Sequence, residues 1–153
     1  MDALVIEFII SIICFLGLFV GLIIGKYTKE ELKEGRKYFL MLMKALFILI
    51  VFYSFYDLGV WWLGLIFLVL FSLVMFSMEK FFYRTSYAVS AVLLVFSFFN
   101  LSSIIPYLVF FYSFPAGTLV YYETKKNRVS ETLKKYYLFL VVIVVLFAVR
   151  LIL

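Results

Sequence analysis

The sequence predicts an all-α fold, a polytopic transmembrane helix bundle whose six spans are arranged as three consecutive hairpins. Composition is the first reason, because 67% of the residues are hydrophobic and only 15% are charged, and a water-soluble domain could not bury so much apolar surface. Length is the second reason. About 20 apolar residues are needed for one crossing, so a chain of 153 residues has room for six spans and little else. We therefore expect one integral membrane domain over residues 1–153.

The basic residues are the third reason, and they also predict the orientation. Twelve of the 14 Lys and Arg residues lie in three clusters, at 26–37, 79–84 and 123–135. Cytoplasmic loops are enriched in Lys and Arg, so the connections 26–37, 78–84 and 123–131 are predicted to be cytoplasmic. Two spans separate each cluster from the next, which returns all three clusters to one side. Both termini are then expected outside the cytoplasm, and the expected location is the cell membrane.

The first predicted span covers residues 3–25. It has a long apolar core with no basic region before it, which favours a retained span over a cleaved signal peptide. Gly17, Gly21 and Gly25 recur at every fourth position within it, and this spacing leaves one helix face without side chains, onto which another helix can pack closely. We expect that helix to come from the same chain. The alternative is self-association, or a membrane-protein partner bound through this face.

The second and third spans are predicted at 38–57 and 60–77. Asp57-Leu58-Gly59 lies between them, and this composition favours a tight connection between antiparallel helices. The fourth and fifth spans then follow at 81–99 and 104–122, joined by a second short turn at 100–103.

One face of the fourth span carries a stripe of hydroxyl groups. Ser86, Ser90 and Ser97 recur there at spacings of four and seven residues. Serines in transmembrane helices commonly hydrogen-bond a carbonyl of their own helix or of a neighbour. We expect that structural role, and a water-filled path along the stripe is the alternative.

The fifth span contains Pro115, which removes an amide donor and clashes with the carbonyl four residues before it. A kink near mid-membrane is therefore predicted. We interpret the kink as a packing feature. The alternative is a hinge that lines a transport site, since discontinuous helices at that depth often do so.

The sixth span is predicted at 132–152 and carries Arg150 toward its outer end. Glu7 lies at the same level on the first span, and a lone charge in the bilayer is costly. An ion pair between Glu7 and Arg150 is therefore predicted. The functional alternative is an ion or proton site formed by Glu7 and Asp57.

Aromatic side chains predict the depth of the helices in the membrane. Tyrosine and tryptophan prefer the membrane interface, so tyrosines beside the basic clusters are expected to form a belt there. These are Tyr27, Tyr38, Tyr83, Tyr87, Tyr121, Tyr122, Tyr136 and Tyr137.

Catalytic and cofactor sites are not predicted. The chain has no His and one Cys, which excludes Ser-His and Cys-His nucleophiles, His-ligated metals and dithiol redox centres. The net charge of +5 does not indicate nucleic acid, because the basic residues flank apolar spans and suit anionic lipid headgroups. The expected partner is the lipid bilayer. The expected function is that of a non-enzymatic membrane subunit or scaffold, with a small-solute transporter, or the membrane component of one, as the alternative.

Overall fold

The computed structural model describes residues 3–28, 32–77, 79–99, 104–124 and 127–152, and this part of the chain is all-helical. The predicted all-α class is confirmed. The helices are α1 (Ala3–Tyr27), α2 (Leu32–Asp57), α3 (Trp61–Ser77), α4 (Glu79–Phe99), α5 (Ile104–Glu123) and α6 (Arg128–Ile152). The predicted turn at 100–103 lies outside the described residues.

Four of these helices are long and apolar enough to cross a membrane. They are α1, the Glu34–Asp57 part of α2, α5 and α6. Two shorter apolar helical segments, Trp61–Ser72 and Thr85–Phe99, come from α3 and α4. The sequence is therefore that of a protein with several candidate membrane spans.

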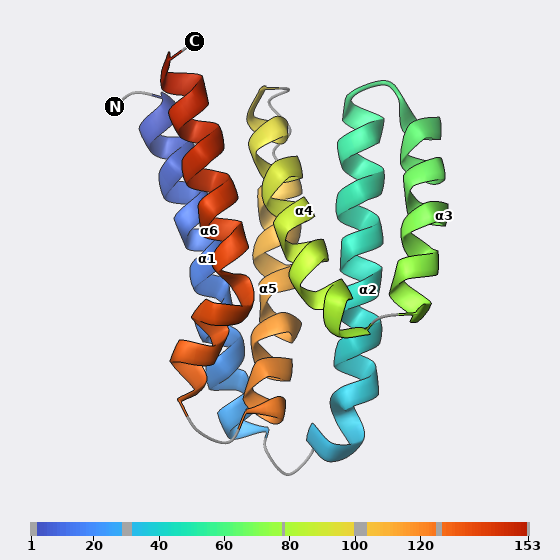
Figure 1. The fold of residues 1–153 in the computed structure, drawn as a ribbon, viewed down its shortest axis with the longest axis vertical. Helices are drawn as coiled ribbons and strands as arrows, with labels where there is room; N and C mark the ends of the chain where they lie inside the picture. Colours follow the sequence, from blue (N-terminus) through green and yellow to red (C-terminus); the bar gives the residue numbers. More distant parts are fainter. Residues whose placement is uncertain (1–2, 29–31, 78, 100–103, 125–126, 153) are drawn as a thin grey trace.

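Consecutive helices run in opposite directions (Figure 1). Both chain termini lie at one end of the bundle, which we call the terminal end. The α1, α3 and α5 helices run away from the terminal end, and α2, α4 and α6 run back toward it; α3 ends and α4 begins well short of the level at which α2 begins. This alternation is what the spacing of the three basic clusters requires.

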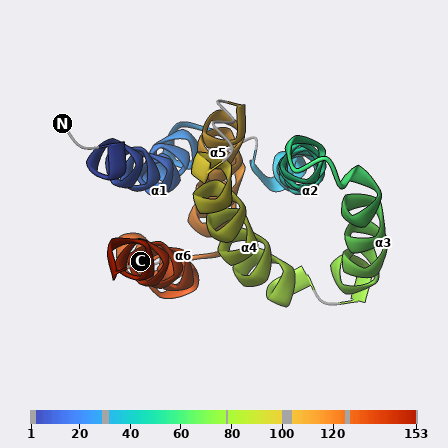
Figure 2. The ribbon, with the colours of Figure 1, turned by 90° about the horizontal axis from the view of Figure 1, so that it is seen from above.

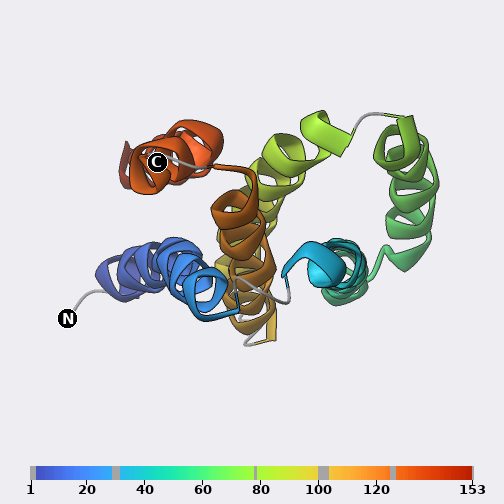
Figure 3. The same cartoon turned by 90° about the horizontal axis from the view of Figure 1, so that it is seen from below.

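Helix packing does not follow the order of the chain, and the predicted set of three consecutive hairpins is not confirmed. The most extensive contacts join α1 to α5, α2 to α5 and α4 to α6. Seen along the bundle from either end, α5 lies between α1 and α2, and α3 stands at the periphery beside α2 (Figures 2 and 3). The physical reason is that the glycine face of α1 admits α5 at close range, as described below.

The turn between α2 and α3 forms at the predicted place. Gly59 has a φ of +72°, a left-handed conformation that costs glycine little. The Gly59 amide donates to the Tyr56 carbonyl at 2.9 Å, and the Val60 amide donates to the Phe55 carbonyl at 3.0 Å. These two bonds make a Schellman motif, which satisfies carbonyls that the end of α2 would otherwise leave unpaired.

The interior of the bundle is built around aromatic rings. Neighbouring rings lie 4.5–6.3 Å apart between centroids, which is the range of favourable aromatic pairs. We call this series the aromatic chain, and it takes one ring from each helix. In order of contact it runs Phe71, Phe47, Tyr112, Tyr87, Phe139 and Phe15.

The predicted tyrosine belt is only partly correct. Tyr27, Tyr38, Tyr122 and Tyr137 are exposed, but Tyr87, Tyr121 and Tyr136 are buried. The Tyr83 side chain lies outside the described part of the structure. Tyrosine is amphipathic, so it also suits a buried site where its hydroxyl finds a partner, and position along the chain does not distinguish the two environments.

Candidate functional site

The three glycines of α1 form its contact with α5. A Cβ atom added to Gly17 would lie 2.0 Å from the Ser113 hydroxyl oxygen, and one added to Gly21 would lie 2.3 Å from the Phe114 carbonyl oxygen. At Gly25 it would lie 2.7 Å from Cβ of Tyr121. Real Cβ atoms do not approach other atoms so closely. Gly21 and Gly25 therefore require glycine, whereas at Gly17 the nearest atom is the end of the Ser113 side chain, which can shift. The face is occupied within the monomer.

The same contact depends on α5 as much as on α1. A Cβ atom on Gly117 would lie 2.0 Å from the Leu18 carbonyl oxygen. The Thr118 hydroxyl shares its one proton between the Gly21 carbonyl at 3.0 Å and the Phe114 carbonyl at 2.9 Å. Sequence reasoning missed both Gly117 and Thr118 as packing residues, although the run of small residues after Pro115 was a usable signal.

Pro115 is buried, and α5 is helical on both sides of it. The residue lacks an amide proton, so the Phe111 carbonyl loses its usual helical donor. The helix nevertheless continues from Ile104 to Glu123, unlike the unwound segments that line many transporter sites. Pro115 therefore sits within the packed α1–α5 contact region instead of at a break in the helix.

The serine stripe of α4 is buried, and its hydroxyls have partners. Ser90 donates to the Ser86 carbonyl at 2.8 Å, and Ser97 donates to the Leu94 carbonyl at 2.6 Å. The Ser86 hydroxyl lies 2.6 Å from the Tyr112 hydroxyl of α5. These bonds satisfy the stripe inside the protein, as the structural interpretation expects.

A second group of polar contacts crosses the centre of the bundle. Tyr87 donates its hydroxyl to the Cys14 carbonyl at 3.3 Å, and the Cys14 thiol donates to the Pro106 carbonyl at 3.4 Å. Tyr87 and Tyr112 are fully buried and Cys14 nearly so. Sequence reasoning placed Tyr87 in the interfacial belt and did not single out Tyr112, yet both join α1, α4 and α5 through hydrogen bonds and ring contacts.

Glu7 and Arg150 form an ion pair between α1 and α6 at the terminal end. The two side chains are 15% and 23% exposed, respectively, so both charges are largely shielded. The Arg150 guanidinium also lies 4.5 Å from the centroid of the Phe99 ring, a cation–π contact. Together these interactions join α1, α4 and α6.

An ionic contact that the sequence did not indicate lies at the opposite end. The Glu123 carboxylate of α5 pairs with Lys135 of α6 and lies 3.8 Å from the Arg36 guanidinium of α2. Arg128 lies 3.6 Å over the Tyr121 ring. One acidic residue thus links three helices among the basic residues that were predicted to face the cytoplasm.

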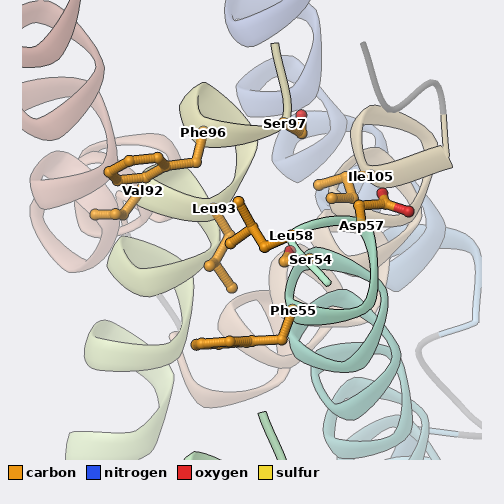
Figure 4. Close-up of a pocket in the computed structure, with 9 residues that line it drawn as sticks. All are labelled: Ser54, Phe55, Asp57, Leu58, Val92, Leu93, Phe96, Ser97 and Ile105. Carbon is orange, nitrogen blue, oxygen red and sulfur yellow. The ribbon is translucent and has the colours of Figure 1, made fainter. Parts of the chain in front are cut away.

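Two cavities open toward the terminal end. The smaller, about 180 Å³, lies between α2, α4 and α5, and Ser54, Asp57, Leu93, Ser97 and Ile105 are among its lining residues (Figure 4). In Figure 4 the Asp57 carboxylate lies on the Ile105 side of this cavity. The remaining wall is largely aliphatic and aromatic.

The larger cavity, about 580 Å³, lies between α1, α4 and α5. We call it the terminal groove, and its wall includes Glu7, Ile10, Ile13, Cys14, Ser97, Pro106, Tyr107 and Phe111. Glu7 and Asp57 therefore line different cavities, which does not favour one ion site built from both carboxylates. In the described part of the chain, no group of three His, Cys, Asp or Glu residues could hold a metal ion.

The site thus consists of a close contact between helices, a largely buried ion pair and an apolar groove. Comparisons with protein-family models, curated proteins and solved structures find no match to this chain. The functional argument therefore depends on the geometry alone.

Proposed function

We propose that the chain is a non-enzymatic subunit or scaffold of the cell membrane, with six spans and both termini outside the cytoplasm. The observation that carries this proposal is the filled centre of the bundle. The aromatic chain joins all six helices there, and the hydroxyls of Ser86, Tyr87 and Tyr112 are buried and hydrogen-bonded. A transporter needs a polar path through this region.

Charge distribution supports the proposed orientation. Arg36, Arg128 and Lys135 gather at the end opposite the termini, and anionic cytoplasmic lipids favour such basic residues. The terminal end instead carries the neutralised Glu7–Arg150 pair. The two short helical segments in α3 and α4 complete a set of six spans if their flanking turns reach the membrane interface.

A membrane-protein partner remains part of the proposal, but the glycine face is not its binding site. Gly17, Gly21 and Gly25 are buried against α5. Self-association through that face would require α1 to leave α5 and lose the Thr118–Gly21 hydrogen bond. A partner must therefore contact another surface of the bundle.

Purification of the tagged full-length protein from its native membrane in mild detergent, with quantitative mass spectrometry, tests the proposal. We expect one membrane protein to co-purify in a fixed ratio. An unrelated multi-pass protein with the same tag is the control for non-specific capture. Recovery of this chain alone, with solute flux after reconstitution, would contradict the subunit proposal.

Small-solute transport is the second candidate function, and the terminal groove beside Glu7 favours it. A transport role predicts that reconstituted vesicles take up solute and that Glu7→Gln changes the rate. The variant Glu34→Gln is the matched control, because Glu34 is an exposed carboxylate in the first turn of α2. Equal flux for protein-containing and empty vesicles would eliminate this candidate for the solutes tested.

A further inference from the structure

One end of the terminal groove is polar, and its deeper part is apolar. Glu7 and Cys14 both line it from α1, and seven residues of helix separate them by about 10 Å along the axis. Ile10 and Ile13 lie between them on the same wall. The groove therefore runs about two helical turns into the bundle, with its carboxylate nearest the chain terminus.

Three polar groups of the wall already have partners, and the fourth, the Tyr107 hydroxyl, belongs to an exposed side chain at the opening. The Cys14 thiol donates to the Pro106 carbonyl, the Ser97 hydroxyl donates to the Leu94 carbonyl, and Glu7 pairs with Arg150. A buried water needs two to four polar partners, and a polar solute needs groups that fix its orientation. An apolar occupant needs neither, and it gains dispersion contacts with the isoleucine and phenylalanine side chains.

The groove opens on the outer surface of the helix bundle. Ile13, Tyr107 and Phe111 all contribute to its wall, and they are 47%, 66% and 51% exposed. They belong to α1 and α5, which are both long and apolar enough to cross a membrane. The medium beside the opening is then the lipid bilayer. The volume of the groove, about 580 Å³, is within the usual range for small-molecule sites.

We propose that the terminal groove binds one acyl chain of a zwitterionic phospholipid from the surrounding bilayer. The acyl chain lies along Ile10, Ile13 and Phe111, and the headgroup lies at the level of the Glu7–Arg150 pair. Charge complementarity selects this headgroup class. The Glu7–Arg150 pair presents one charge of each sign, so the remaining guanidinium N–H groups suit the phosphate and the second carboxylate oxygen suits the ammonium, whereas a purely anionic headgroup matches only the guanidinium.

The inference rests on the proposed membrane insertion but not on the proposed subunit role. Its test uses the full-length protein in vesicles of phosphatidylcholine that carries a photoactivatable diazirine midway along one acyl chain. After irradiation, mass spectrometry of peptides locates the cross-links. We expect them to concentrate on residues 7–14 of α1 and 106–111 of α5. Cross-links distributed evenly over the exposed faces of all helices would indicate bulk lipid and overturn the proposal.

Variants that fill the groove provide the second measurement. Ile10→Trp and Ile13→Trp each place a larger side chain in the wall and are expected to reduce these cross-links roughly tenfold, equivalent to about 1.4 kcal/mol of binding free energy. Ile9→Trp is the matched control, because Ile9 is also apolar and 44% exposed on α1 but is not among the lining residues of the groove. Unchanged cross-linking in both groove variants, with their helicity intact, would overturn the proposal.

Competition tests the headgroup. Unlabelled phosphatidylcholine should displace the photoactivatable lipid from residues 7–14 more effectively than the same amount of phosphatidylglycerol. Equal or stronger displacement by phosphatidylglycerol would overturn the zwitterionic assignment. None of these measurements depends on detecting a protein partner. Failure of the lipid-binding proposal and failure of the subunit proposal therefore give different experimental results.

Discussion

The carboxylate of Glu7 pairs with the guanidinium of Arg150, which joins the first helix to the last across 143 positions of the chain. Each residue would be costly alone in a low-dielectric environment. Their pairing leaves the terminal end of the bundle with a neutral, largely shielded group next to the terminal groove.

Removal of one member of this pair is expected to destabilise the protein. Breaking a fully buried pair costs roughly 3–5 kcal/mol, and these side chains keep some exposure, so Glu7→Gln or Arg150→Gln should cost about 1–3 kcal/mol. Unfolding in mixed micelles measures the change. The double variant should lose less than the sum of the single variants, and strict additivity would show that the pair contributes no coupling energy.

Gly21→Ala is expected to disrupt the α1–α5 contact. The added Cβ would lie 2.3 Å from the Phe114 carbonyl oxygen, so the helices must separate, with an expected loss of about 1–3 kcal/mol. Gly35→Ala is the control, since its Cβ would meet only the Phe39 ring at 3.7 Å, an ordinary contact. Alanine is the better helix former, so the control should be neutral or stabilised by up to about 1 kcal/mol. Thermal unfolding that ranks the two variants equally would contradict the packing argument.

Thr118→Val preserves the shape of the side chain and removes the hydroxyl that bonds the Gly21 carbonyl. Interhelical hydrogen bonds in membranes average about 0.6 kcal/mol and reach about 1.7 kcal/mol, so a loss in this range is expected from the free energy of unfolding. Thr132→Val is the matched control, because the buried Thr132 hydroxyl bonds only its own helix at the Arg128 carbonyl in the described contacts. A greater loss for Thr132→Val would contradict the importance assigned to the interhelical bond.

Labelling with a membrane-impermeant maleimide tests the orientation. Cys14 is buried, so the unchanged protein should react little, and Cys14→Ser supplies a background without thiols. In that background Leu151→Cys should react in intact cells, because Leu151 is 77% exposed at the terminal end. Glu34→Cys, exposed at the opposite end, should react only after the membrane is permeabilised. The reverse pattern would place both termini in the cytoplasm.

The sequence by itself determined the helical class and the approximate helix positions. Hydropathy and basic clusters depend on local composition, and the turn at Gly59 depends on a residue that tolerates positive φ. The predicted bounds are those of membrane spans, and several helices extend past them. The α2 and α6 helices begin at Leu32 and Arg128, several residues before the predicted spans at 38 and 132, because a helix can continue past its apolar segment into water.

Part of the candidate site could also be predicted, because its signals were local. Glu7 and Arg150 are charges in apolar segments, and a charge there needs a partner. The glycine spacing of α1 predicted a close helix contact, and the structure places α5 there.

Only the tertiary structure decided which helix meets which, and where the rings of Tyr87 and Tyr112 lie. In a water-soluble protein, the polar face of a helix indicates its exposed side. Here lipid is as apolar as the protein interior, so polarity does not distinguish a lipid-facing residue from a buried one. The α1–α5 contact, the aromatic chain and the terminal groove follow instead from the shapes of helix surfaces that are distant in the sequence.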